Sequence, residues 1–392
     1  MPDAQPCSYI VWGNAEYLYW VMRDSQLPVL LAQGPTPAID PATGFPSATA
    51  VPPIATVLAG NSSTVPQERS GMRFTLGFWF NRCQNWGIDG SYFMLAKRGT
   101  SYEYAGTGTE GNGIDTFRPF TNTISRATDP TATNGPSGPD YELINRQGVA
   151  GTFSYNTSSQ LWGGDLNLRK NLWLGCRGRL DAIAGFRYLR FEEQLDINES
   201  SRTLAGSGLP ALSGMLNDSF LVRNDFYGGQ LGLAGQIRRG RWTLDGVTKV
   251  ALGTNHQNLS ISGSQTIAGS MPPSANFGLL TQPSNSGEFN RNVFSVVPEF
   301  GLTLGYQVTP NIKVFAGYNF MYVSNVLRVA DQIDTTLDVE TRPGTRQATQ
   351  PTSAIIGPRV LAGSGPQTRP AVLFKDTDFW VQGGTVGLQF TW

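Results

Sequence analysis

Residues 294–322 read FSVVPEFGLTLGYQVTPNIKVFAGYNFMY, and apolar and polar side chains alternate along most of this stretch. Successive side chains of a β-strand point to opposite faces, so Phe300, Leu302 and Leu304 would share one face, with polar and glycine residues on the other. The alternation breaks at residues 308–311, Val-Thr-Pro-Asn, which contain residues typical of turns. The stretch therefore predicts two antiparallel strands joined by a tight turn, each with one apolar and one polar face.

The same alternation recurs along the chain and predicts about ten strands, with twelve as the alternative count. The predicted strands span residues 8–22, 71–81, 86–97, 154–169, 179–196, 219–237, 241–261, 292–307, 312–328 and 377–392. Long and short connections alternate, and the long ones are 23–70, 98–153, 197–218, 262–291 and 329–376. All long loops would then lie at one end and all short turns at the other. This pattern predicts an all-β fold, a transmembrane antiparallel up-and-down β-barrel.

The positions of the prolines agree with these strands. Proline has no backbone N–H to donate to a neighbouring strand, so it is rare inside a sheet. Pro298 is the one proline within the predicted ranges. It predicts a bulge or a strand end at that point.

The composition fits one β-domain with little exposed charge. The 392 residues are 40% hydrophobic and only 15% charged, and no run approaches the roughly 18 apolar residues of a membrane helix. The formal net charge is zero and charged residues are dispersed, so we expect no nucleic-acid partner. No linker divides the chain, and residues 1–392 are interpreted as one barrel domain with an N-terminal tail at 1–7. No metal-ligand spacing or cofactor motif is present, so none is expected.

Aromatic residues near the ends of the strands predict where the barrel would meet the membrane surfaces. Amphipathic rings favour the boundary between lipid and water, so a transmembrane barrel carries an aromatic girdle at each boundary. A soluble β-sandwich could bury the same rings, but its crossing connections would break the regular order of long and short connections. The residues predicted to form the two girdles are Trp12, Phe80, Trp86, Trp162, Tyr188, Trp242, Tyr306, Trp380 and Trp392.

Charged residues on the opposite strand faces would point into the barrel. A barrel of about ten strands has an interior only slightly wider than side chains can fill. Because an unpaired buried charge is costly, we expect these residues to pair across the interior and to block it. The predicted charge network consists of Glu16, Arg73, Asp165, Asp181, Arg187, Asp245, Lys249, Glu299 and Lys313.

Several strand sequences resemble a known family. They are RFTLGFW at 73–79, CQNWGIDGSYF at 83–93, LDAIAGFRYL at 180–189, DFYGGQLGL at 225–233, VPEFGL at 297–302 and FAGYNF at 315–320. These segments resemble the planctomycete outer-membrane β-barrel family, long known only as a domain of unknown function. The resemblance runs from the first strand to about Asp334 and implies an outer-membrane location. It implies no substrate, cofactor or catalytic residue.

Three roles are compatible with these features, and we rank a structural or surface-interaction role first. A narrow passive pore is the first alternative, and a hydrolase with its site among the loops is the second. The chain has one histidine, His256, and a Ser-His type of site would need a nucleophile and an acid beside it. Asp331 and Asp334 could supply the acid only if another loop brought them close. We therefore expect no enzymatic activity.

The expected partners are those of an outer-membrane protein. These are membrane lipid, an extracellular partner of unknown kind, and the barrel assembly machinery, because the final Phe390-Thr391-Trp392 resembles the terminal assembly signal of such proteins. A signal peptide is expected for export, but residues 1–5 lack its basic and apolar regions. Cys83 and Cys176 fall in two short turns at the same predicted end. A disulfide between two of the chain's three cysteines is therefore open.

Overall fold

The computed structural model describes most of the chain. The described residues are 11–36, 39–40, 45–46, 53–63, 67–81, 83–109, 113–123, 138–208, 211, 213–268, 274–338 and 368–392. Within these residues, no helix is long and apolar enough to cross a membrane.

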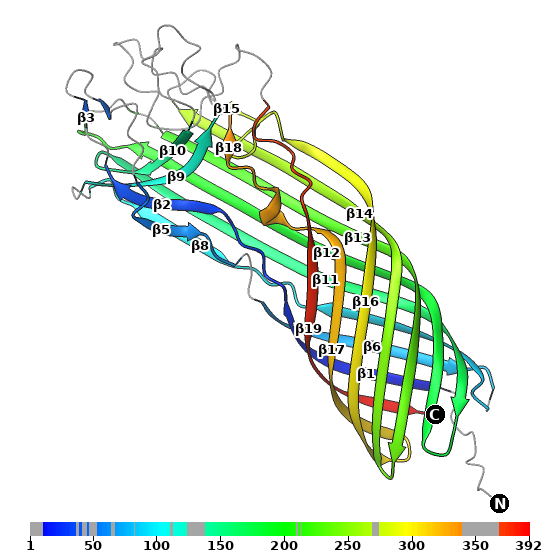
Figure 1. The fold of residues 1–392 in the computed structure, drawn as a ribbon. Coiled ribbons are helices and arrows are strands. Elements are labelled where there is room, and N and C mark those ends of the chain that lie inside the picture. The colour runs from blue at the N-terminus through cyan, green and yellow to red at the C-terminus, as the bar shows by residue number, and fades with distance from the viewer. Residues whose placement is uncertain are drawn as a thin grey trace, which may run out of the picture.

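Ten antiparallel strands form a closed ring, as the sequence predicts (Figure 1). Starting from β1, the neighbours around the ring are β6, β7, β11, β12, β13, β14, β16, β17 and β19, and β19 pairs with β1 again. The strands of the ring are β1 (Val11–Met22), β6 (Glu68–Trp79), β7 (Trp86–Leu95), β11 (Val149–Leu174), β12 (Gly178–Thr203), β13 (Ser213–Arg239), β14 (Trp242–Ala268), β16 (Gly287–Thr309), β17 (Ile312–Leu327) and β19 (Asp376–Thr391).

The ring has a turn end and a loop end. Four short connections, 80–85, 175–177, 240–241 and 310–311, join neighbouring strands at the turn end. The first strand begins and the last strand finishes at this end, where Trp12 is opposite Thr391. All the longer connections lie at the loop end. The alternation of long and short connections in the sequence is therefore a property of the fold.

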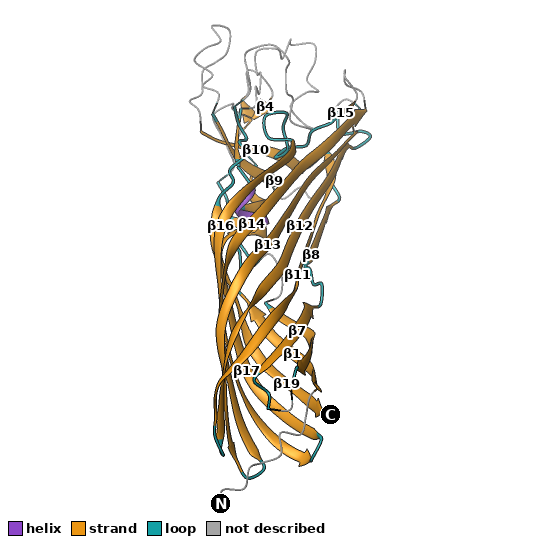
Figure 2. Ribbon diagram, turned by 90° about the vertical axis from the view of Figure 1, so that its right-hand side faces the viewer, coloured by secondary structure: helices purple, strands orange, loops and turns teal. Residues whose placement is uncertain are grey.

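The ring is much taller on one side than on the other. β11 and β12 have 26 residues each and β13 and β14 have 27 each, whereas β1 and β6 have 12 each and β7 has 10. Figure 2 shows β11, β12, β13 and β14 rising past β1 and β7. We call the part of these four strands beyond the short strands the tall wall. A bilayer crossing needs only about 9–11 residues per strand, so the tall wall is longer than a crossing requires.

The predicted loops 98–153, 197–218 and 262–291 are therefore partly wrong, because much of them is strand. β11, β12, β13 and β14 continue well beyond the predicted ranges, and β8 (Ser101–Gly106) pairs with the upper part of β11. In the extra segments, residues that face outward are mostly polar, while inward ones such as Ile197 and Leu216 are buried. Such buried faces can be recognised only once the second sheet that covers them, described next, is known.

A second sheet covers the inner side of the tall wall, and we call it the cap. It consists of β5 (Thr56–Gly60), β2 (Val29–Pro35), β9 (Ile114–Asn122) and β10 (Gly138–Asn145), with β18 (Thr336–Leu337) parallel to β9 (Figure 1). Leu31 and Phe120 of the cap pack with Leu195 and Phe220 of the tall wall in one buried apolar cluster. The remaining short elements are β3 (Ile39–Asp40), β4 (Phe45–Pro46), β15 (Ser274–Ala275) and the 3₁₀ turn η2 (Val329–Gln332).

A buried ion triad holds the cap to the tall wall. Arg118 of β9 pairs with Glu199 of β12 at 2.8 Å and with Asp218 of β13 at 2.9 Å. All three side chains are at most 3% exposed. Burial raises the pKa of Glu199, although Arg118 opposes that change. Charges removed from water in this way tie the cap to one position, because separating them would leave each one uncompensated.

Pro298 lies in the middle of β16, so the predicted bulge or strand end is wrong. Its residue remains in register with Val250 of β14, and no register shift interrupts that ladder. The ladder between β16 and β17 begins one residue later, at Glu299 opposite Met321. Pro298 therefore lies just outside the β17 ladder, and proline is tolerated where a strand is unpaired on one side.

The sequence leaves a disulfide between the cysteines open, and the two described cysteines do not form one. Cys83 and Cys176 are both free and exposed, in short connections at the turn end. Cys7 lies outside the described residues.

Candidate functional site

The outward face of the ring is apolar over a band of its height. Phe300, Leu302 and Tyr318 are 46%, 42% and 44% exposed although all are large apolar side chains. The band covers residues 180–188 on β12 and 227–237 on β13, close to the roughly 9–11 residues that cross a bilayer. Above it, the outward positions of both strands are mostly polar.

Aromatic rings lie at both edges of this band. At the edge nearer the loop end, the ring centroids of Tyr92, Trp162, Tyr188 and Tyr227 follow one another at 6.2, 5.3 and 5.1 Å. Trp380 of β19 is opposite Tyr322 of β17, in the loop-side half of both strands. The rings nearest the turn end are Phe80, Trp86, Trp242, Tyr306 and Trp392, of which Trp242 and Tyr306 contact each other at 5.0 Å.

The assignment of Trp12 to a membrane boundary is wrong. Trp12 is 9% exposed, stacks on Trp79 at 5.3 Å inside the barrel, and has the Arg169 guanidinium 5.4 Å from its ring. Residues two apart on a strand share a face, and Trp12 shares its face with Asn14 and Glu16, which line the interior. The alternation along β1 therefore placed Trp12 inside, but its aromatic character suggested the membrane surface.

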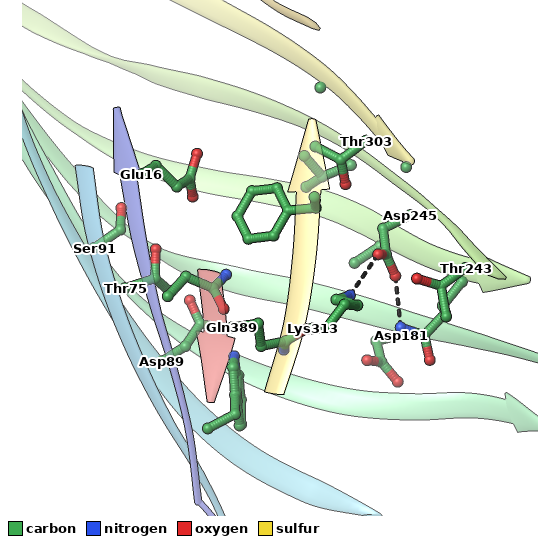
Figure 3. A pocket seen from close by; sticks show the side chains of 18 of the residues that line it. Glu16, Thr75, Asp89, Ser91, Asp181, Thr243, Asp245, Thr303, Lys313 and Gln389 are labelled. Carbon is green, nitrogen blue, oxygen red and sulfur yellow. Dashed lines mark hydrogen bonds and ion pairs between the residues drawn. The ribbon is translucent and has the colours of Figure 1, made fainter. Parts of the chain in front are cut away.

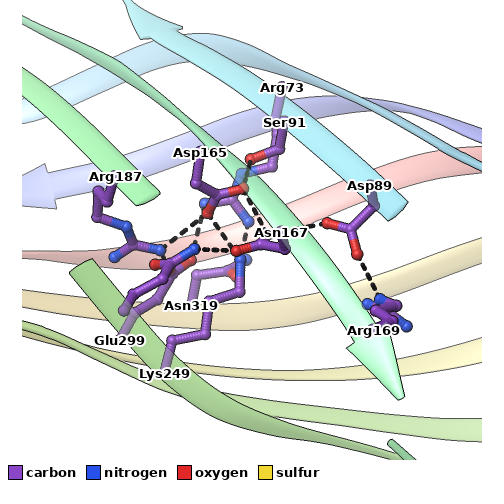
Figure 4. Close-up of polar contacts among 11 residues, drawn as sticks. Arg73, Asp89, Ser91, Asp165, Asn167, Arg169, Arg187, Lys249, Glu299 and Asn319 are labelled. Carbon is purple, nitrogen blue, oxygen red and sulfur yellow. Dashed lines mark hydrogen bonds and ion pairs between the residues drawn. The ribbon is translucent and has the colours of Figure 1, made fainter. Parts of the chain in front are cut away.

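Five strands contribute to one ion-pair cluster across the barrel, which we call the central charge network (Figure 4). Arg187 pairs with Asp165 at 3.1 Å and also with Glu299. Lys249 Nζ lies 2.8 Å from Asp165, and Arg73 Nη2 lies 3.4 Å from Glu299. None of these side chains is more than 13% exposed. Each carboxylate thus meets two cations, which offsets the cost of removing it from water.

A second set of ion pairs lies nearer the turn end. Lys313 Nζ is 2.7 Å from Asp245, and Arg179 Nε is 2.7 Å from Asp181. Arg169 bridges Asp181, at 3.4 Å, to a further carboxylate on β7. Eight of the nine predicted interior charges are therefore in ion pairs, and Glu16 is the exception among the described residues.

An apolar layer fills the interior on the loop side of the central charge network, and the sequence analysis missed it. Phe191 and Phe379 stack across the barrel with ring centroids 4.5 Å apart, and Trp20 lies 5.7 Å from Phe93. We call this cluster the inner apolar layer. Its buried members are Leu18, Trp20, Met22, Phe93, Leu95, Leu161, Leu189, Phe191, Phe226, Ala251, Val297, Met321, Val323, Val326, Phe379 and Val381.

A signal for this layer exists in the sequence. On β12 the inward face runs through Asp181 and Arg187 and then continues with Leu189 and Phe191. Around Tyr188 and Leu189 both faces of the strand are therefore apolar, which a purely water-filled interior would not require. The prediction of a polar interior assumed that the inward face of each strand is polar along its whole length.

A cavity of about 760 Å³ occupies the interior on the turn side of the network (Figure 3). Its lining includes Arg238 and Arg241 near the β13–β14 turn and Thr309 and Pro310 of the β16–β17 turn, all exposed at the turn end. No residue of the cap lines it. The cavity is therefore open toward the turn end and closed by the central charge network and the inner apolar layer above it.

The loop end offers no assembled hydrolytic site among the described residues. The His256 Nδ1 lies 2.7 Å from Asn292 Oδ1 on the outer side of the tall wall. Asp334 pairs with Arg369 at 2.8 Å and Asp331 with Lys375 at 3.3 Å. In the described ranges, no group of three or more His, Cys, Asp or Glu side chains is placed to hold a metal ion.

Residues 12–392 match the model of the family described as "Putative beta barrel porin-7 (BBP7)". The chain belongs to this family. The BBP7 chain accordingly has an outer-membrane β-barrel fold. Its planctomycete origin stays a prediction from the sequence.

Solved structures resemble the BBP7 chain only distantly. The outer membrane protease OmpT from Escherichia coli is 11% identical, with a TM-score of 0.42 and coverage of 98% of this chain and 97% of that one. A Pseudomonas aeruginosa FadL homologue is 8% identical, with a TM-score of 0.24 and coverage of 98% and 90%. No curated protein matches the sequence. At these values the solved structures carry no conclusion about activity.

Proposed function

We propose that this protein is a closed outer-membrane barrel with a structural or surface-interaction role, which holds a rigid cap above the membrane. The inner apolar layer carries this proposal. Phe191, Phe379 and Trp20 are each at most 4% exposed, so solvent barely reaches their side chains in the middle of the barrel. An open diffusion pore needs a continuous polar passage, which such packing does not leave.

The cap supports the same role. Its buried contacts with the tall wall and the Arg118 triad fix one face of folded sheet at the loop end. In the orientation expected for this class of barrel, the loop end faces the outside and the turn end faces the periplasm. The cap and the outer side of the tall wall would then be the surfaces that meet an extracellular partner, and catalysis is not part of the role.

Two partners follow from the position of the barrel. The apolar band would contact membrane lipid, and β19 would engage the assembly machinery through its aromatic final residues. The pairs β19–β1 and β19–β17 both run nearly the length of the strand. Insertion of β19 thus has to precede or accompany closure of the ring.

Conductance in planar bilayers tests the closed state. The folded protein should give no steady current, whereas Phe191→Ala with Phe379→Ala, which empties the middle of the inner apolar layer, should give measurable conductance. The double variant also proves that inserted protein is present and detectable. A large steady current through the unaltered protein would instead establish a passive pore, the role that the family's description suggests.

A matched pair of proteins tests the surface role. Proteoliposomes carrying the intact protein should adhere to the partner cell or matrix, and proteoliposomes carrying Arg118→Met, whose cap is released, should not. The barrel must remain folded in both, as judged by β-sheet circular dichroism. Equal adhesion, or none by the intact protein, would contradict the proposal.

A further inference from the structure

Glu16 is the one carboxylate lining the interior cavity that has no cation within 4.0 Å among the described residues. The other five, on Asp89, Asp165, Asp181, Asp245 and Glu299, all take part in ion pairs. The contact that Glu16 does make is a hydrogen bond from the Thr385 hydroxyl, 3.0 Å from Oε2. A carboxylate inside a barrel is costly unless water or a cation compensates it. Glu16 therefore retains the capacity to bind a cation.

A cationic residue does lie beside Glu16 in the sheet, but its charge is used elsewhere. Arg73 is directly opposite Glu16 in the β1–β6 register. Its guanidinium instead reaches Glu299, donates to Asn319 Oδ1 at 3.2 Å and lies 5.1 Å from the Trp20 ring. Arg73 lines the same cavity, but its guanidinium is engaged in the central charge network, and Glu16 is left without a cationic partner.

Hydrogen-bond acceptors surround Glu16 on the same wall. Asn14 lies two residues away on the same face of β1, and its Oδ1 has no hydrogen-bond partner among the described residues. Thr75 and Gln389 occupy the positions on either side of Asn14 in the sheet. Figure 3 shows Glu16, Thr75 and Gln389 around the cavity, and Lys313, the neighbour of Gln389 on β17, reaches from there to Asp245.

We propose that this cavity binds a small molecule through a protonated amine, with the ammonium group held by the Glu16 carboxylate. An ammonium ion has three donors, which one carboxylate and neighbouring amide and hydroxyl oxygens can accept. Such a bond between two charged groups is stronger than a neutral hydrogen bond. A metal ion fits less well, because the described residues place no cluster of three metal-binding side chains here. The volume of about 760 Å³ is within the range of small-molecule sites.

Two arginines at the mouth of the cavity add a second preference for the charge of the ligand. Arg238 and Arg241 line it and are exposed, and neither guanidinium forms an ion pair among the described residues. They disfavour a ligand that carries only positive charge and favour one with an acid group at its other end. The ligand class is therefore a small zwitterion, with an amine directed inward and an acid group directed to the turn end.

Three probes of equal chain length separate these contributions. Isothermal titration calorimetry on the folded full-length protein in detergent would use 5-aminopentanoate, pentylamine and pentanoate. We expect 5-aminopentanoate to bind more tightly than pentylamine, and pentanoate not to bind measurably. Glu16→Gln should weaken the binding of 5-aminopentanoate at least about tenfold, because it removes the charged partner while keeping the shape of the side chain.

Two further variants keep the test independent of folding. Glu288→Gln makes the same change on an exposed residue near the loop end and should leave binding unchanged. Thr385→Val keeps the Glu16 charge but removes its hydroxyl donor, and should change affinity only a few-fold. Circular dichroism melting of each variant verifies the fold. The proposal is overturned if Glu16→Gln binds as the unaltered protein does, if pentanoate binds equally well, or if no probe binds. None of these results bears on conductance, which tests the closed barrel separately.

Discussion

The two halves of the barrel interior are built from the same strands but exclude or admit water by different means. β12 places Arg187 and Asp181 on the turn side, and Leu189 and Phe191 on the same face toward the loop side. The turn-side half keeps a cavity lined by paired charges, whereas the loop-side half holds the inner apolar layer, with the buried Arg328–Glu193 pair against its rings. The comparison supports the proposal that apolar packing, rather than the charges below it, closes this barrel.

Removing the Phe191–Phe379 pair should have the largest effect. Truncating one large buried aromatic side chain typically lowers the free energy of unfolding by about 3–5 kcal/mol, so the double alanine variant should lose more than either single variant. Denaturant unfolding from lipid vesicles measures the loss. Phe300→Ala is the control, because its ring faces the lipid and leaves no internal cavity. An equal loss for Phe300→Ala would mean that the interior packing has no special importance.

Breaking the central charge network should have the next largest effect. Arg187→Ala leaves Asp165 and Glu299 with Lys249 and Arg73 alone, and the free energy of unfolding should fall by about 3 kcal/mol, the lower limit for a broken buried pair. The closed state should survive, because the inner apolar layer is intact. A large conductance in this variant would show that charges, rather than apolar packing, close the barrel.

Releasing the cap should affect the loop end only. Arg118→Met leaves Glu199 and Asp218 buried without their cation, and we expect the cap to separate from the tall wall while the ring stays folded. Hydrogen exchange should then rise in β2 and β9, with no change in β1, β6 and β7. Uniformly faster exchange across the ring would show instead that the cap and the barrel unfold as one unit.

The smallest effect should come from acid on the segment after η2. Burial tends to raise the pKa of Asp334, but hydrogen bonds from the Ala371 and Thr336 backbone and from Arg369 lower it below its usual value overall. Because the folded-state pKa lies below the unfolded one, the carboxylate stabilises the segment above the usual value of 3.8, and this contribution disappears as the pH falls through the folded-state pKa. Proteolysis near residues 334 and 371 should increase over that range, and Asp334→Asn should remove most of the change.

The sequence predicted the ring well because lipid imposes a strict rule on its outer face. Every second residue must be apolar, as in Phe300 and Leu302, so strand number, order and orientation were all readable. The interior obeys no such rule, because the side chains there respond to neighbours from distant strands. Trp12 was therefore placed on the wrong face, and the packing of Phe191 and the cap contacts of Leu195 were not predicted. Pro298 was misjudged for a similar reason, because the end of the β16–β17 ladder beside it depends on β17.

The difference in strand length has a mechanical consequence. At about 3.3 Å per residue, a 26-residue strand such as β11 is roughly 85 Å long, of which lipid contacts less than half. Hydrogen-bonded sheet is stiff, so displacing the cap sideways would tilt the whole barrel in its bilayer before it bent the strands. A force on the outermost surface would thus be transmitted to the part of the ring inside the lipid, and the barrel would tilt toward the side of the short strands.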